Sequence, residues 1–341
     1  MAIKRWVALG LTLLMTVALL CACAKKNDEE GSESTVYYTV TFNANGGSAV
    51  ESRKVAEGTK VSEPAAPVRE GYVFKEWTKD GTTWLFDYDT VKSDITLTAS
   101  WIEAVNMFDY TVTEDKTAVI TGLKQKAKVI VVPTQIGGYA VTGVGEAVFQ
   151  NLMTVEEAEG NSEGVAEIVL PETVFSVGKN AFRDSDGITV TVQGALTEIG
   201  EGAFYNCDGL TKIFLGEGLQ KISYEAFSGC VGLQSVQLPQ SVTLIEENAF
   251  EGCEQLVSVM LYDGVTAVEN SAFDDCKSLT LIYWIGAEEN LDTLLEQNTA
   301  EMNDPLLEAH VYLYAEQKPT SETVYDGYWY RDEKGTVRIW Q

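Results

Sequence analysis

Four cysteines in the second half of the chain recur at a fixed interval and are the first candidates for chemistry. They are Cys207, Cys230, Cys253 and Cys276, and each lies 23 residues after the one before it. Regularly spaced thiols can form disulfides in an exported protein, or they can stay free and buried. A zinc site is a weaker alternative, because zinc ligands come as tight pairs such as CxxC and the single histidine, His310, is distant in the sequence.

A phenylalanine precedes each of these cysteines by three residues, so the spacing belongs to a repeated phrase. The phenylalanines are Phe204, Phe227, Phe250 and Phe273. A fixed period of this length is typical of a solenoid, in which no coil buries its apolar side alone and stacking creates one continuous core. We therefore expect the four cysteines and four phenylalanines to form a buried structural ladder.

The cysteine position favours free thiols over disulfides. Leu152 and Ser185 stand at the same position in earlier coils, which indicates that it takes a small or apolar side chain. Stacked side chains also point in parallel, so their Cβ atoms stay about as far apart as the coils, about 4.8 Å. A relaxed disulfide needs about 3.8 Å between Cβ atoms. We predict four free, buried thiols and no metal.

A strand follows each cysteine, with apolar residues such as Leu210, Ile213 and Leu215 turned inward. The residue between the last two of these, seven after the cysteine, points outward. The outward row comprises Val169, Phe214, Gln237, Met260 and Tyr283. Such rows lie side by side on the face that solenoids commonly use for partners, which makes this row a candidate binding face. The alternative is that these side chains pack on one another or lie under flanking segments, and the sequence leaves both open.

The phrase "L..I.LP..V..I...AF..C" resembles the leucine-rich repeats of the BspA-like bacterial surface antigens. The resemblance implies a mainly β solenoid over residues 107–284 and a C-terminal β cap over residues 285–341, which contains "AHVYLYAEQKP". It also implies a binding or adhesion function without catalysis. An acidic insertion at residues 153–167 departs from the pattern, and its role stays open.

Residues 37–101 alternate apolar and polar residues between turn signals, which predicts four or five short strands. Their expected aromatic core is Phe42, Tyr72, Phe74, Trp77, Phe86 and Trp101. The segments "VTFNANGG", "REGYVFKEW" and "ITLTASW" resemble the Listeria–Bacteroides repeat, a β-grasp-like module of bacterial surface proteins. In that family the module serves as a spacer or a weak interaction unit.

The first 23 residues have the features of a secretory signal: Lys4 and Arg5 precede a short apolar run, which ends in "LCAC". That ending resembles the bacterial lipobox and implies lipidation at Cys23, with an ordinary cleaved signal as the alternative. Residues 24–36 are polar and charged, as expected of a flexible tether. The chain is thus predicted to be exported and lipid-anchored to the outer face of a bacterial membrane.

The charge of the chain limits its partners. There are 24 basic and 51 acidic residues, a net charge of −27, which makes nucleic acid a poor partner. The resemblance to the BspA-like surface antigens implies a protein of a host or neighbouring cell as the leading partner. A neutral glycan, bound for nutrient capture, is the second. One histidine and no GxSxG, phosphate-loop or HExxH motif favour a protein that is not an enzyme and needs no cofactor. A carboxylate-based glycosidase is the weakest alternative, because no spacing singles out a pair of acids.

Overall fold

The computed structural model describes residues 35–127, 129–152, 164–297, 300–320, 323 and 325–340. Residues 37–341 belong to one compact unit. The predicted signal peptide with Cys23, most of the predicted tether and residues 153–163 of the acidic insertion lie outside the described residues. Within the described part, no helix has the length and apolar character needed to cross a bilayer.

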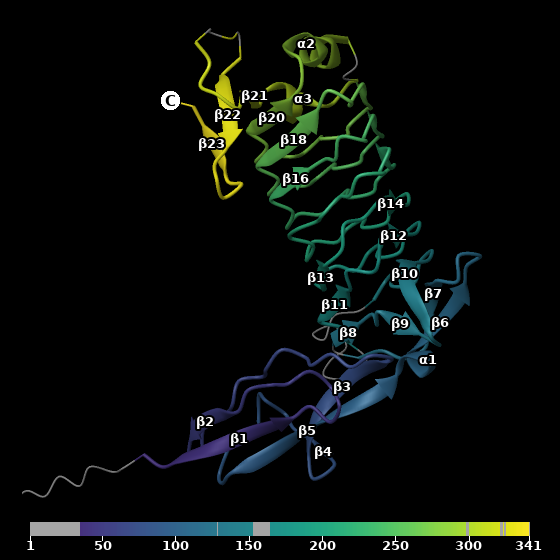
Figure 1. Cartoon of the computed structure of the whole chain (residues 1–341), viewed down its shortest axis with the longest axis vertical. Coiled ribbons are helices and arrows are strands. Elements are labelled where there is room, and N and C mark those ends of the chain that lie inside the picture. Colours follow the sequence, from purple (N-terminus) through teal and green to yellow (C-terminus); the bar gives the residue numbers. More distant parts are fainter. Residues whose placement is uncertain are drawn as a thin grey trace, which may run out of the picture. The chain divides into compact units, whose positions relative to one another are not determined.

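The N-terminal module is a five-stranded sheet with the strand order β2-β1-β5-β3-β4 (Figure 1). The strands are β1 (Tyr37–Asn43), β2 (Arg53–Ala56), β3 (Tyr72–Lys79), β4 (Thr82–Thr83) and β5 (Ile95–Glu103). Phe42, Phe74 and Trp77 are buried and pack with their rings 5.0 to 5.5 Å apart. Tyr72 is only half-buried and lies outside this core, because its ring supports the guanidinium of Arg69 at 3.8 Å.

The module packs directly onto the start of the solenoid. Val73 of β3 is fully buried in the solenoid core, where it joins Met107 and Phe108. The connection is the short helix α1 (Ala104–Met107), which leads into the antiparallel pair β6 (Phe108–Val112) and β7 (Ala118–Leu123). The two parts therefore share buried apolar surface.

The solenoid has two series of short parallel strands. We call the first the long-strand side; its strands are β8 (Val129–Val131), β11 (Glu167–Leu170), β13 (Thr189–Val192), β16 (Ser235–Gln237), β18 (Ser258–Tyr262) and β20 (Leu281–Ile285). The second series follows β7 through β10 (Tyr139–Val144), β12 (Ser176–Val177), β14 (Glu198–Ile199), β15 (Lys221–Ile222), β17 (Leu244–Ile245) and β19 (Ala267–Val268). The two-residue strand β9 (Gln135–Ile136) pairs with β10. The predicted mainly β solenoid is confirmed.

The repeated phenylalanines stack through the centre of the coils. Consecutive rings from Phe182 to Phe273 have centroids 5.1 to 5.5 Å apart and planes within 14° of parallel. The cysteines are free and fully buried beside them. Each thiol donates to the backbone carbonyl of the phenylalanine one coil earlier, as Cys230 does to Phe204 O at 3.1 Å. The cysteine position thus holds a small donor.

Both strand series break at one place, between β13 and β16 and between β14 and β15. The coil before this break is short: Phe182 and Phe204 are 22 residues apart (204 − 182), whereas the later phenylalanines are 23 apart. Residues 211–214 consequently form no strand, and Phe214 O accepts a hydrogen bond from Leu196 N at 2.9 Å instead of from β13. One missing residue therefore moves the next coil out of register.

The C-terminal region continues the long-strand side. Strand β21 (His310–Tyr314) pairs in parallel with β20, β22 (Gly327–Arg331) pairs in parallel with β21, and β23 (Val337–Ile339) turns back antiparallel. Two helices that the sequence analysis does not anticipate complete the cap: α2 (Glu288–Gln297) and α3 (Asp304–Leu307). Leu291 and Leu294 of α2 are buried, and Asn303 Oδ1 accepts from Phe273 N at 2.9 Å, where a further coil would otherwise pair.

Candidate functional site

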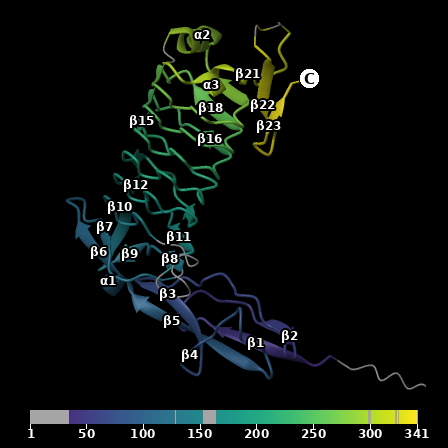
Figure 2. The ribbon, with the colours of Figure 1, turned by 180° about the vertical axis from the view of Figure 1, so that it is seen from behind.

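The outward row predicted from the sequence is partly covered. Gln237, Met260 and Tyr283 are neighbours in register on β16, β18 and β20. The hairpin of β22 and β23 lies beside these strands in both views (Figures 1 and 2). Arg331 Nη2 donates to Gln237 Oε1 at 3.1 Å and contacts Met260 Sδ at 3.2 Å, and the ring of Trp329 lies 5.5 Å from that of Tyr283.

The hairpin covers part of the expected outward row and leaves other residues of the row uncovered. Met260 is only 6% exposed, so this position is not available to a partner while the hairpin is in place. Phe214 is 45% exposed and carries the Lys212 ammonium 4.4 Å from its ring centroid, but it lies at the break in the sheet. Val169 lies in a separate place, at the junction with the N-terminal module.

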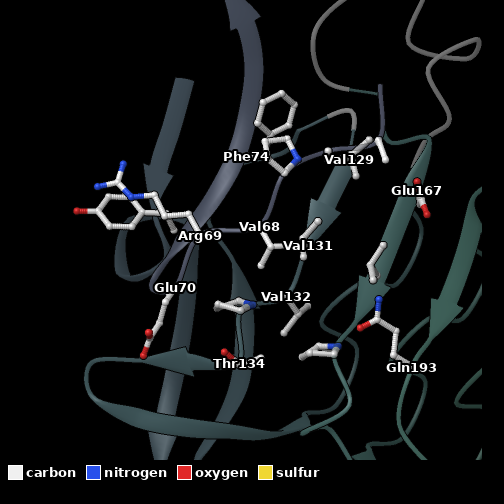
Figure 3. Close-up of a pocket in the computed structure, with 17 residues that line it drawn as sticks. Val68, Arg69, Glu70, Phe74, Val129, Val131, Val132, Thr134, Glu167 and Gln193 are labelled. Carbon is white, nitrogen blue, oxygen red and sulfur yellow. The ribbon is translucent and has the colours of Figure 1, made fainter. Parts of the chain in front are cut away.

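The junction between the module and the first coils holds a cleft of about 250 Å³, which we call the junction cleft (Figure 3). Its apolar walls come from both parts of the chain. The module contributes Pro67, Val68 and Phe74, and the coils contribute Val129, Val131, Pro133, Val169 and Pro171. In the close-up, Val68 and Val131 lie next to each other from opposite walls.

Hydrogen bonds hold both walls of the junction cleft. On the module side, Val68 N donates to Ser48 Oγ at 2.9 Å, and Ser48 N donates to Val68 O at 2.8 Å. On the solenoid side, Val131 and Val169 are partners in the parallel pair of β8 and β11. Val68 nevertheless remains 58% exposed, so the cleft presents an apolar side chain on a fixed backbone.

The charged residues that line the junction cleft are one arginine and two glutamates. Arg69 lines it, but its guanidinium lies over Tyr72 and donates to Asn45 O at 3.3 Å, and it points away from Val131 (Figure 3). Glu70 and Glu167 also line the cleft, and the Glu70 carboxylate likewise points away from Val131 (Figure 3). An occupant therefore meets an apolar floor with negative charge beside it.

The sequence singled out Val169 but missed Val68 and Val131. Val169 was found through the coil period, whereas Val68 lies in a proline-containing loop of the module with no repeat to mark it. The cleft exists only because the module docks on the first coils, and a repeat pattern does not encode that docking.

The buried thiols and the single histidine have simple structural surroundings. Burial raises the pKa of the Cys207 and Cys230 thiols, so they stay protonated and poorly nucleophilic. His310 Nδ1 lies 2.9 Å from Asp326 Oδ1 on the exposed start of β21. No group of three or more His, Cys, Asp or Glu side chains in this part of the chain is arranged to hold a metal ion.

Residues 157–280 match the family model of the BspA-type leucine-rich repeat region, in six copies. The chain carries a BspA-type leucine-rich repeat region. Residues 38–100 match the model of the Listeria–Bacteroides repeat domain. Both resemblances proposed from the sequence are confirmed.

Two curated proteins of Evansella cellulosilytica are similar to part of this chain. One, whose name describes it as a Gly-rich membrane protein, is 43% identical over 67 residues, which are 19% of this chain and 8% of the relative. The other, whose name describes it as a membrane protein, is 37% identical over 75 residues, which are 21% of this chain and 11% of the relative. The match thus spans about a tenth of the length of these relatives.

Two solved structures also resemble the chain. The leucine-rich repeat protein of T. pallidum is 29% identical, and the match covers 57% of this chain and 83% of that one with a TM-score of 0.46. A leucine-rich cell surface protein of Faecalibacterium prausnitzii A2-165 is 25% identical, with 68% of this chain and 59% of that one covered and a TM-score of 0.49.

Proposed function

We propose that this BspA-type repeat protein is a non-catalytic binding protein of a bacterial cell surface, anchored through a lipid on Cys23. Its partner is a protein of a host or neighbouring cell. The partner places an apolar side chain in the junction cleft and a lysine or arginine at its rim.

The exposed apolar floor of the junction cleft is the observation that carries this proposal. Hydrophobic side chains on rigid walls give binding energy with little ordering cost, because the backbone is already held. The hydrogen bonds between Val68 and Ser48 and the pairing of β8 with β11 supply that rigidity. Phe214, exposed further along the long-strand side, extends the surface available to a large partner.

Charge selects the partner class. The net charge of −27 and the carboxylates of Glu70 and Glu167 favour a segment that combines an apolar anchor with basic neighbours. The buried, protonated thiols and the exposed position of His310 support a role without catalysis.

The test is a substitution in the floor of the junction cleft. Val68→Asp, made in residues 37–341, places a charge where the partner's apolar side chain would be buried, and Val68 is exposed enough for the fold to tolerate it. Surface plasmon resonance against a panel of purified extracellular-matrix proteins should show that the unaltered protein binds at least one member. The affinity of Val68→Asp for that member should be at least about tenfold weaker.

Val112→Asp is the matched control, because Val112 is 45% exposed on β6 and does not line the junction cleft. It should bind like the unaltered protein. If Val68→Asp binds normally while Phe214→Ala weakens binding, the partner uses the exposed middle of the long-strand side and the cleft assignment is wrong.

A further inference from the structure

The module carries a second concave site, away from the solenoid. We call it the hairpin hollow; it has a volume of about 590 Å³ and lies between the β3–β4 hairpin and the loop that follows. Its lining is Lys79, Asp80, Thr82, Thr83, Trp84, Tyr88, Asp89, Thr90 and Lys92. None of these residues lines the junction cleft.

An exposed aromatic ring dominates the hairpin hollow. Tyr88 is 78% exposed, the highest value among the large apolar side chains of the described residues. A backbone turn holds it: Tyr88 N donates to Leu85 O at 2.9 Å, and Leu85 N donates to Asp89 Oδ2 at 2.8 Å. The ring is therefore displayed on an ordered turn, where leaving it in water has a hydrophobic cost.

The opposite wall is equally well ordered. Asp80 and Gly81 both have positive φ, 51° and 82°, as a two-residue type I′ hairpin requires. Lys79 and Thr82 are partners in the antiparallel pair that this turn closes. The hollow is thus lined by an aromatic ring and polar groups that ordered backbone turns carry.

Four of the polar side chains that line the hairpin hollow are available for a ligand. Within the described part of the chain, no hydrogen bond engages the hydroxyl of Thr82 or Thr90, and Lys79 and Lys92 form no ion pair. Two lysines and two aspartates line the hollow, so their formal charges cancel. Mixed donors and acceptors with no net charge suit an uncharged ligand rich in hydroxyl groups.

We propose that the hairpin hollow binds a neutral oligosaccharide. One pyranose ring lies with its C–H face on Tyr88, as an apolar surface on an aromatic face, and its hydroxyls hydrogen-bond to Thr82, Thr90 and the lysine ammoniums. Anionic polysaccharides are excluded, because the chain as a whole is strongly acidic and the hollow has no surplus of positive charge.

The experiment uses residues 37–341 and a glycan array of neutral and sulfated oligosaccharides, followed by isothermal titration calorimetry with the neutral hexasaccharides that bind. Tyr88→Ala should lower the affinity about tenfold or more without changing the melting temperature, since the ring has no buried contact to lose. Tyr37→Ala is the matched control, because Tyr37 is 62% exposed on β1 and lies outside the hollow.

Three results would overturn the proposal. The first is an array with no neutral oligosaccharide bound at millimolar concentration, and the second is an array with sulfated glycans alone bound. The third is an equal loss of affinity in Tyr88→Ala and Tyr37→Ala. Tyr88→Ala should leave binding at the junction cleft unchanged, because Tyr88 does not line that cleft, so the matrix-protein measurement separates this site from the proposed protein-binding site.

Discussion

The cysteine position shows what a single residue contributes to the repeat. In four coils a thiol donates to the phenylalanine carbonyl of the preceding coil at 3.1 to 3.2 Å, and in an earlier coil Ser185 Oγ donates to Phe149 O at 2.6 Å. The sequence predicted that the position takes a small or apolar side chain, because Leu152 and Ser185 stand there in earlier coils. The hydrogen bond itself was not predicted, because packing alone explains why a small or apolar residue recurs at this position.

This donor role leads to a prediction at Cys253, which is fully buried. Cys253→Ser keeps the donor to Phe227 O, as Ser185 does, and should lower the free energy of unfolding by less than about 1 kcal/mol. Cys253→Ala removes the donor and leaves a small void, and should cost about 1–3 kcal/mol. Urea unfolding of both variants measures the difference. Equal losses in serine and alanine variants would show that the thiol acts through its volume only.

Among the secondary-structure elements, those that follow the repeat could be predicted from the sequence. The sheet break and the C-terminal helices could not. Most coils repeat the same buried positions, so most strands, the phenylalanine stack and the solenoid followed from the period. The strand expected over Leu210, Ile213 and Leu215 was wrong, because residues 211–214 form no strand and Leu215 is only half-buried. The sheet break followed from one absent residue between Phe182 and Phe204, a signal that was present in the spacing but whose effect on pairing depends on backbone register. The cap has no period, and its helices and covering hairpin were therefore not predicted.

The covering hairpin gives a prediction at this scale. Arg331 is the residue whose side chain joins β22 to Gln237 and Met260, so Arg331→Ala should loosen the hairpin and expose the Met260 thioether. Oxidation of Met260 by hydrogen peroxide, followed by mass spectrometry, should become severalfold faster and approach that of Met302, which is 60% exposed. Arg338→Ala is the control, because Arg338 Nε pairs with Asp332 Oδ2 of the same hairpin at 3.1 Å, its one ion pair among the described residues. No acceleration in Arg331→Ala would mean that Trp329 and the pairing of β22 with β21 keep the hairpin closed without Arg331.

For the whole molecule, the two candidate sites differ in how far sequence alone could find them. The junction cleft joins Val68 to Val131 and Val169, residues brought together by the docking of the module on the solenoid through Val73. Such docking depends on surface fit and has no local pattern. The hairpin hollow lies within one module, and its Asp-Gly turn was a readable signal, but the exposure of Tyr88 was not.

The attachment of the whole molecule to a membrane depends on Cys23, in the "LCAC" sequence, which lies outside the described residues. In the proposed function, acyl chains on this cysteine supply the anchor, since each buried methylene contributes about 0.8 kcal/mol and stable attachment needs more than one chain. Cys23→Ala should therefore move the protein from the membrane fraction to the soluble fraction in cell fractionation. Cys21→Ala is the matched control and should remain in the membrane fraction. Release of Cys21→Ala with retention of Cys23→Ala would assign the lipid to Cys21. Retention of both variants in the membrane fraction would show that no lipid on these cysteines anchors the protein. The protein would then be attached to the membrane in another way.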